Sequence, residues 1–177
     1  MNRNSAMLLS LFLLAGCSVV DPRRASLEFS ALSHDMGESQ AMALNSRLEW
    51  RCNDDAQNRH IFGQRACDGL LDTLNEVPAT RIDYMFRDGH LSAMIVQYPS
   101  DQYKAMKAGV EAQLSQGSNR DPPRSSLTGL FGGPGANVVF WKAKGGLVMT
   151  SKEGSNRDGN LILAWMSNEE IARYSGK

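Results

Sequence analysis

The stretch ATRIDYMFRDGHLSAMIVQYP, residues 79–99, decides the fold class of this chain. In its first half Ile82, Tyr84 and Phe86 alternate with charged residues, which is the period-two pattern of a strand with one buried face. Asp88 and Gly89 then supply the positive φ angles of a tight turn. The second half, HLSAMIVQY, is apolar on both faces, as in an interior strand. The stretch therefore predicts a β-hairpin, and hairpins imply antiparallel pairing.

Further strands are predicted on both sides of this hairpin. Residues 137–167, NVVFWKAKGGLVMTSKEGSNRDGNLILAWMS, indicate three strands with turns at Gly145-Gly146 and EGSNRDG. Upstream, SRLEWRC (46–52) alternates, which favours a strand with Leu48, Trp50 and Cys52 on one face; a helix over the same residues is the alternative.

Four helices are predicted between the strands. They cover 37–45, 67–77 with Asp68 as N-cap, 100–117 with an apolar stripe, and 168–174 after the capping box SNEE. Together the elements predict an α+β domain: a mostly antiparallel twisted sheet with helices packed on one face. We expect the large apolar side chains to divide between a core and a more exposed face: Trp50, Phe86, Ile95, Phe140, Trp141, Leu161, Leu163 and Trp165.

The N-terminal residues have the features of a targeting sequence. A basic n-region with Arg3, the apolar run MLLSLFLL (7–14) and small residues before Cys17 are typical of a secretory signal peptide. The end of this run, LAGC (14–17), resembles the lipobox of bacterial lipoproteins. The resemblance implies cleavage before Cys17 and acylation of its thiol; an ordinary signal peptide is the alternative. We therefore expect a signal peptide at 1–16, a lipidated N-terminus and tether at 17–35, and a single periplasmic domain at 36–177.

The residue after Cys17 indicates which membrane the protein is sorted to, and the net charge indicates which classes of partner are disfavoured. In many lipoproteins an aspartate after the cysteine retains the protein in the inner membrane, so Ser18 implies the outer membrane. Without residues 1–16 the chain has 18 basic and 19 acidic side chains, because Arg3 is lost. A net charge near −1 gives no electrostatic case for binding nucleic acid.

Two cysteines remain when Cys17 is acylated. In an oxidising compartment Cys52 and Cys67 are predicted to form one disulfide. The alternative is a metal site built from these cysteines with His60 and Asp54 or Asp55, but the spacing matches no common ligand pattern. We therefore expect neither a metal nor a cofactor.

A long irregular segment, residues 117–136, contains the most distinctive motif, GLFGGPGAN (129–137). Leu130, Phe131 and Pro134 lie in a glycine-rich setting and form a candidate partner-binding loop. The alternative is that the two apolar side chains fold back onto the sheet.

No catalytic pattern is evident. His34, His60 and His90 are isolated in the sequence, and the neighbouring His90 and Ser92 lack an orienting acid. The carboxylate pairs Asp54-Asp55 and Glu169-Glu170 fit a solvated loop and a helix start. We expect a non-enzymatic outer-membrane lipoprotein, facing the periplasm, that binds another envelope protein as an accessory or assembly factor. The alternatives are a binding module for a small molecule, lipid or cell-wall fragment, and an inhibitor of a hydrolase.

Overall fold

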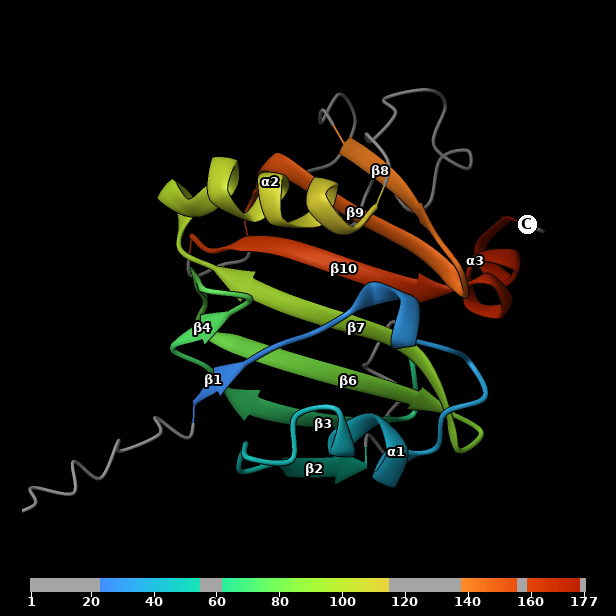
Figure 1. The fold of residues 1–177 in the computed structure, drawn as a ribbon. Coiled ribbons are helices and arrows are strands. Elements are labelled where there is room, and N and C mark those ends of the chain that lie inside the picture. The colour runs from blue at the N-terminus through green and yellow to red at the C-terminus, as the bar shows by residue number, and fades with distance from the viewer. Residues whose placement is uncertain (1–22, 55–61, 115–137, 156–158, 176–177) are drawn as a thin grey trace, which may run out of the picture.

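The computed structural model describes residues 23–54, 62–114, 138–155 and 159–175. Among these residues, a seven-stranded sheet runs in the order β2-β3-β6-β7-β10-β9-β8, and every neighbouring pair is antiparallel (Figure 1). Its strands are β2 (Arg51–Asp54), β3 (Arg65–Leu70), β6 (Arg81–Arg87), β7 (His90–Tyr98), β8 (Val138–Ala143), β9 (Gly146–Ser155) and β10 (Leu161–Ser167). The fold is α+β, as the sequence predicts.

The hairpin that decided the fold class is confirmed. β6 pairs with β7, and the connecting residues Asp88 and Gly89 have φ angles of 52° and 82°. Both angles lie in the left-handed region that a two-residue hairpin turn requires. The pair occupies the middle of the sheet, where β7 also pairs with β10. The consecutive apolar residues of β7 follow from this central position, because both of its faces are covered.

The three C-terminal strands are also confirmed. β8 and β9 form a hairpin through Lys144 and Gly145, and β9 then pairs with β10. Gly146 lies close to the neighbouring strand: a Cβ at this position would be 1.9 Å from the backbone oxygen of Met166. Only glycine therefore permits this approach of β9 to β10.

Helices cover one face of the sheet. They are α1 (Glu38–Ala43) and α2 (Tyr103–Gln113), with the short 3₁₀ turns η1 (Phe29–Ala31) and η2 (Ser100–Gln102). Met106 and Val110 of the predicted apolar stripe are buried against the sheet. α3 (Asn168–Ser175) begins as the capping box predicts, because the Ser167 hydroxyl accepts a hydrogen bond from the Glu170 N–H at 3.1 Å.

The helix predicted over 67–77 is wrong. These residues form the end of β3 and a small second sheet, in which β4 (Thr73–Leu74) pairs with β5 (Val77–Pro78). Asp68 lies within β3, opposite Arg51 and Asp83, and caps no helix. Leu71 and Leu74 are buried, but Leu70 is exposed. The leucine spacing suits a helical face equally well, and pairing of β3 with β2 and β6 overrides this local preference.

The predicted tether ends earlier than residue 35. β1 (Arg24–Ala25) pairs in parallel with β4 and joins the small second sheet. Leu27, Phe29 and Leu32 are each only 2% exposed and belong to the main core. The folded part therefore begins by Arg24, not at Met36. Ala25, Leu27 and Phe29 are buried at every second position, although only Arg24–Ala25 is a strand.

The strand predicted over 46–52 begins later than expected. β2 starts at Arg51, although Leu48 is buried while its neighbours Arg47 and Glu49 are exposed. The alternation of apolar and charged residues in 46–52 therefore predicts which side chains are buried, even where the backbone does not pair with another strand.

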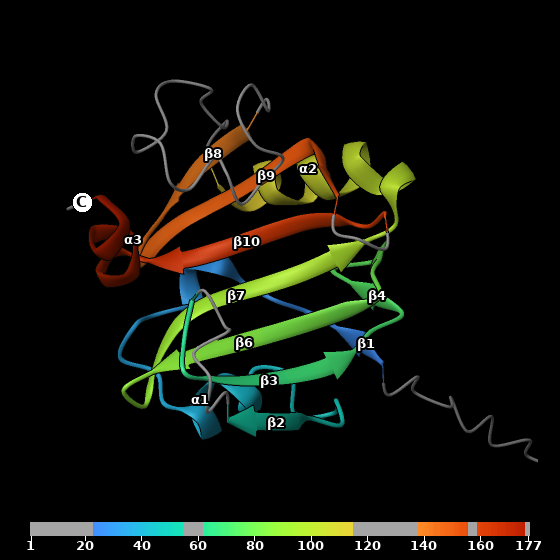
Figure 2. The same ribbon diagram turned by 180° about the vertical axis from the view of Figure 1, so that it is seen from behind.

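The apolar side chains divide between two buried clusters on opposite faces of the sheet, rather than between a core and a more exposed face. The main core lies between the sheet and the layer of α1, α2 and the N-terminal residues. Trp50 packs at its margin, and a second cluster occupies the opposite face, where Ile171 and Tyr174 of α3 contribute (Figure 2). The main core contains Phe86, Trp141, Leu161, Leu163 and Trp165, whereas Phe140 and Ile95 belong to the second cluster.

Two buried tyrosines make the fold sensitive to alkaline pH. Burial raises the pKa of Tyr84 to about 12 from its ordinary 10.0, and burial also raises the pKa of Tyr98. Above pH 10 the unfolded state loses these protons first, so the folded state binds more protons and stability falls with rising pH. We expect the free energy of unfolding to fall by about 1.4 kcal/mol per pH unit for each tyrosine between about pH 10 and 12.

Urea unfolding across this pH range measures the effect. Tyr84→Phe should reduce the slope, and the double variant Tyr84→Phe/Tyr98→Phe should reduce it further, leaving a remainder because the pKa values of Tyr174 and Lys107 are also raised. A slope in the double variant equal to that of the wild type would contradict this account.

Candidate functional site

A disulfide connects the edge of the main sheet to its second strand. Cys52 of β2 and Cys67 of β3 are direct cross-strand partners, with their sulfur atoms 2.05 Å apart. The predicted pairing is therefore present. Among the described residues β2 pairs only with β3, so this bond holds the edge strand in place covalently.

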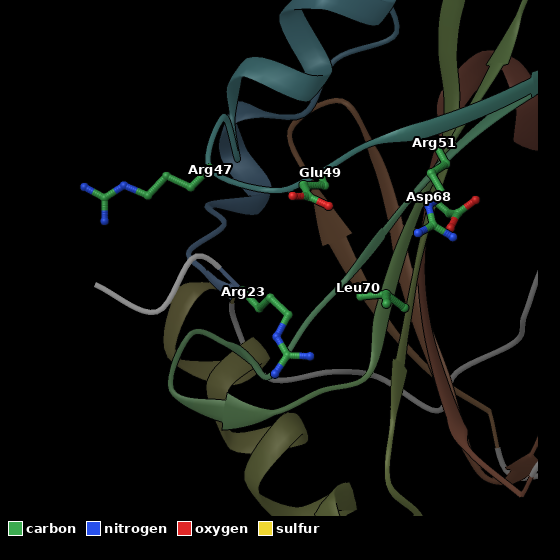
Figure 3. Close-up of a pocket in the computed structure, with 6 residues that line it drawn as sticks. All are labelled: Arg23, Arg47, Glu49, Arg51, Asp68 and Leu70. Atoms are coloured by element: carbon green, nitrogen blue, oxygen red, sulfur yellow. The ribbon is translucent and has the colours of Figure 1, made fainter. Parts of the chain in front are cut away.

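A pocket of about 220 Å³ lies at the same edge (Figure 3). It is formed by the segment that enters β2, by β2 itself, by the C-terminal half of β3 and by the residue that precedes β1. Its lining residues are Arg23, Arg47, Glu49, Arg51, Asp68 and Leu70.

The strand pairing explains why these side chains share one surface. Asp68 and Leu70 are two residues apart on β3 and therefore point to the same face of the sheet. Arg51 is the direct cross-strand partner of Asp68 on β2, so it lies on that face too. Leu70 is 54% exposed, the largest exposure of any big apolar side chain in the described residues. Arg47 extends away from the other five side chains (Figure 3).

Ion pairs neutralise part of this surface. Arg23 contacts Asp72 at 2.9 Å. Asp68 lies 3.5 Å from Arg81, which also contacts Asp83 at 2.7 Å. The lining therefore presents charges of both signs beside the exposed Leu70. The pocket is small beside the roughly 300–1,000 Å³ that drug-sized ligands occupy.

Two histidines that are far apart in the sequence meet at the other end of the hairpin. The His34 and His90 rings lie with their centroids 5.1 Å apart. His34 Nδ1 is 3.2 Å from the Leu91 carbonyl oxygen and 4.0 Å from a carboxylate oxygen of Glu169. Nδ1 therefore carries the proton that this carbonyl accepts. No nucleophile joins this corner among the described residues.

Ser92, two residues after His90, has its hydroxyl engaged by the backbone. The Ser92 hydroxyl is buried and donates to the backbone carbonyls of Phe62 and Met85, the second at 2.9 Å. Since the hydroxyl is engaged by backbone oxygens, it fixes the segment that follows residue 61 onto β7.

The two carboxylate pairs of the sequence behave differently from each other. Asp54 is exposed, as expected, but it is the last residue of β2 and not part of a loop, and it contacts Arg65 at 2.6 Å. Glu170 instead is buried, with a side chain that is 2% exposed and receives two hydrogen bonds from Arg87. Both members of the second pair lie in the first turn of α3, as predicted, and α3 packs Glu170 against the end of the hairpin.

The alternative metal site receives no support from the described residues. Glu38, Cys52 and Cys67 lie together, but both sulfur atoms belong to the disulfide and the Glu38 carboxylate binds Arg65. His60 and Asp55 lie outside the described residues.

Several predicted positions also lie outside this part of the chain: Cys17, Leu130, Phe131 and Pro134. None of the described helices is long and apolar enough to cross a membrane. Sequence reasoning did not find the edge pocket, since its residues come from four segments. The one available signal was the charged half of the SRLEWRC alternation, which supplies Arg47, Glu49 and Arg51.

The chain matches no family model, and neither a curated protein nor a solved structure resembles it significantly. Its function must therefore be inferred from its own residues.

Proposed function

We propose that this chain is an outer-membrane lipoprotein, anchored through Cys17, whose folded part binds another envelope protein and performs no catalysis. The LAGC motif supports the anchor, and Ser18 after the cysteine supports the outer membrane. The folded part begins by Arg24. The seven residue steps from Cys17 span at most about 25 Å, so an acylated Cys17 keeps the domain beside the bilayer.

The observation that carries the partner role is the open edge strand β8. In the described part of the sheet β8 pairs only with β9, and it lies at the end opposite β2 (Figure 1). Its six residues are long enough to pair with an extended segment of another protein. β2 is a poorer edge because it has four residues, of which three are exposed and polar.

The proposal puts the anchor and the partner at different ends of the domain. β1, where the folded part begins, lies on the β2–β3–β6 side of the sheet, whereas β8 is the far strand (Figure 1). A partner bound at β8 is therefore held away from the attachment point but remains within reach of the membrane.

Site-specific photo-crosslinking in cells tests this proposal. A photoreactive residue replaces Lys142, which is exposed on β8, or Asn53, which is exposed on β2 and serves as the control. We expect one dominant envelope protein to be captured from position 142, and not from position 53. Cys17→Ser should abolish this capture, because the domain is no longer held at the membrane.

Two results would overturn the proposal in separate ways. Equal capture from positions 142 and 53, or none from either, contradicts the partner site. Capture that persists unchanged in Cys17→Ser contradicts the role of the anchor.

A further inference from the structure

Some of the described arginines form ion pairs with carboxylates, and others do not. The described residues contain eight arginines. Five have a carboxylate within ion-pair distance: Arg23, Arg65, Arg81, Arg87 and Arg173. In the described structure the other three have no such contact: Arg24, Arg47 and Arg51.

These three arginines line two pockets that share one residue. Arg47 and Arg51 line the edge pocket, and Arg24 and Arg47 line an adjoining pocket of about 230 Å³. Arg47 is thus shared by both pockets, and all three side chains are exposed. The exposed Leu70 also lines the edge pocket. We refer to Arg24, Arg47, Arg51 and Leu70 as the basic edge.

Acidic residues near the basic edge do not cancel its charge. Asp72 is held by Arg23 at 2.9 Å, and Asp68 lies 3.5 Å from Arg81. Among the described residues that line the two pockets, Glu49 is the one carboxylate without an ion-pair contact. Arg81 is shared between Asp68 and Asp83, so five arginines and four carboxylates meet at this edge. This leaves an excess of one positive charge beside the exposed Leu70.

We infer that the basic edge binds the phosphodiester head groups of anionic phospholipids. A guanidinium pairs with phosphate oxygens through two parallel N–H donors, which suits arginine better than lysine. Leucine beside such charges can enter the boundary between head groups and acyl chains. The inference rests on the anchor of the proposed function, since seven residue steps from an acylated Cys17 keep Arg24 within about 25 Å of the bilayer.

Head-group binding would give the lipoprotein a defined orientation. An acyl anchor fixes one point of the chain and leaves the domain free to rotate. A second contact at the β2 end turns that edge toward the bilayer and directs β8 away from it (Figure 1). Because this contact is electrostatic, the orientation of the domain should depend on the charge of the lipids and on the salt concentration.

Hydrogen exchange on the full lipidated protein tests the inference. The protein is purified from membranes and inserted through its own anchor into vesicles of phosphatidylcholine, or of three parts phosphatidylcholine to one part phosphatidylglycerol. We expect the amides of β2 and β3 to exchange several-fold more slowly in the mixed vesicles. High salt should remove this protection, because it screens the charges.

Variants identify the residues responsible. The variant Arg24→Gln/Arg47→Gln/Arg51→Gln should lose the phosphatidylglycerol-dependent protection. Arg51→Gln alone should raise the phosphatidylglycerol fraction needed for half-maximal protection by about fivefold, the equivalent of about 1 kcal/mol per basic residue. Lys104→Gln/Lys142→Gln/Lys144→Gln is the matched control, since it removes three exposed cations from other parts of the fold.

The outcomes separate the inference from the proposed function. If the protein does not float with phosphatidylcholine vesicles, the anchor is wrong and the inference fails with it. If it floats but phosphatidylglycerol has no effect, or the arginine and lysine variants lose protection equally, only the inference is wrong. Equal protection by dissolved glycerol phosphate in phosphatidylcholine vesicles would also overturn it, since the site would then select a soluble phosphate.

Discussion

Replacing Arg87 by methionine should lower the free energy of unfolding by about 3 kcal/mol. The Glu170 side chain is 2% exposed and accepts hydrogen bonds from Arg87 Nε and Nη2, both at 3.0 Å. Methionine keeps much of the side-chain volume but leaves a buried carboxylate without its main partner. The expected loss is at the lower end for a broken buried pair, because Arg87 is itself 21% exposed. Urea unfolding at neutral pH measures it.

Arg173 provides a matched control, because it contacts the same Glu170 carboxylate. Arg173 contacts Glu170 at 3.6 Å, but its side chain is 57% exposed, so Arg173→Met should cost well under 1 kcal/mol. The double variant Arg87→Met/Glu170→Met removes both charges and should recover much of the stability lost in Arg87→Met. Equal losses for Arg87→Met and Arg173→Met would show that the pair is not a buried one.

Removal of the disulfide is expected to have an effect of similar size. The double variant Cys52→Ala/Cys67→Ala should lose about 3 kcal/mol, because the bond closes a loop with a sequence separation of 15. The loss should be concentrated at β2, since in the described structure this edge strand has no other neighbour than β3. Hydrogen exchange should therefore show faster exchange in β2 than in the central strands β6 and β7.

Reduction of the wild type supplies the control. Under dithiothreitol the wild-type protein should become about as unstable as the double variant, and the reductant should have no further effect on the variant. Two free thiols in the native protein before reduction would contradict the disulfide directly. A stability difference confined to the loop residues, with β2 unchanged, would contradict its role in holding the edge.

How far the sequence predicts the fold depends on the range of the forces involved. The β6–β7 hairpin follows from alternation and from Asp88-Gly89, and α2 follows from its apolar stripe. These features depend on neighbours within a few residues. The same local reasoning failed for 67–77. The leucine pattern there suits a helix, but β3 pairs with β2 and β6 and is part of the sheet.

The candidate site was less accessible to sequence reasoning than the fold. The cysteine pair could be predicted because the compartment and an even count leave few alternatives. The basic edge could not, since Arg24, Arg47 and Arg51 line adjoining pockets only when β1 pairs with β4 and β2 pairs with β3. Whether an arginine is paired is also invisible in the sequence, as the contact between Arg87 and Glu170 across 83 positions shows.

By itself, then, the sequence determined the central hairpin, the main helix, the three C-terminal strands and the cysteine pair, because turns, caps and periodicity act over short distances. The tertiary structure alone decided that residues 24–35 belong to the folded part and that 67–77 forms strands and a turn instead of a helix. It also decided that three arginines without an ion-pair contact in the described structure lie near Leu70. The physical reason is that burial and charge pairing are properties of surfaces. Such surfaces form only when segments distant in the sequence pack together.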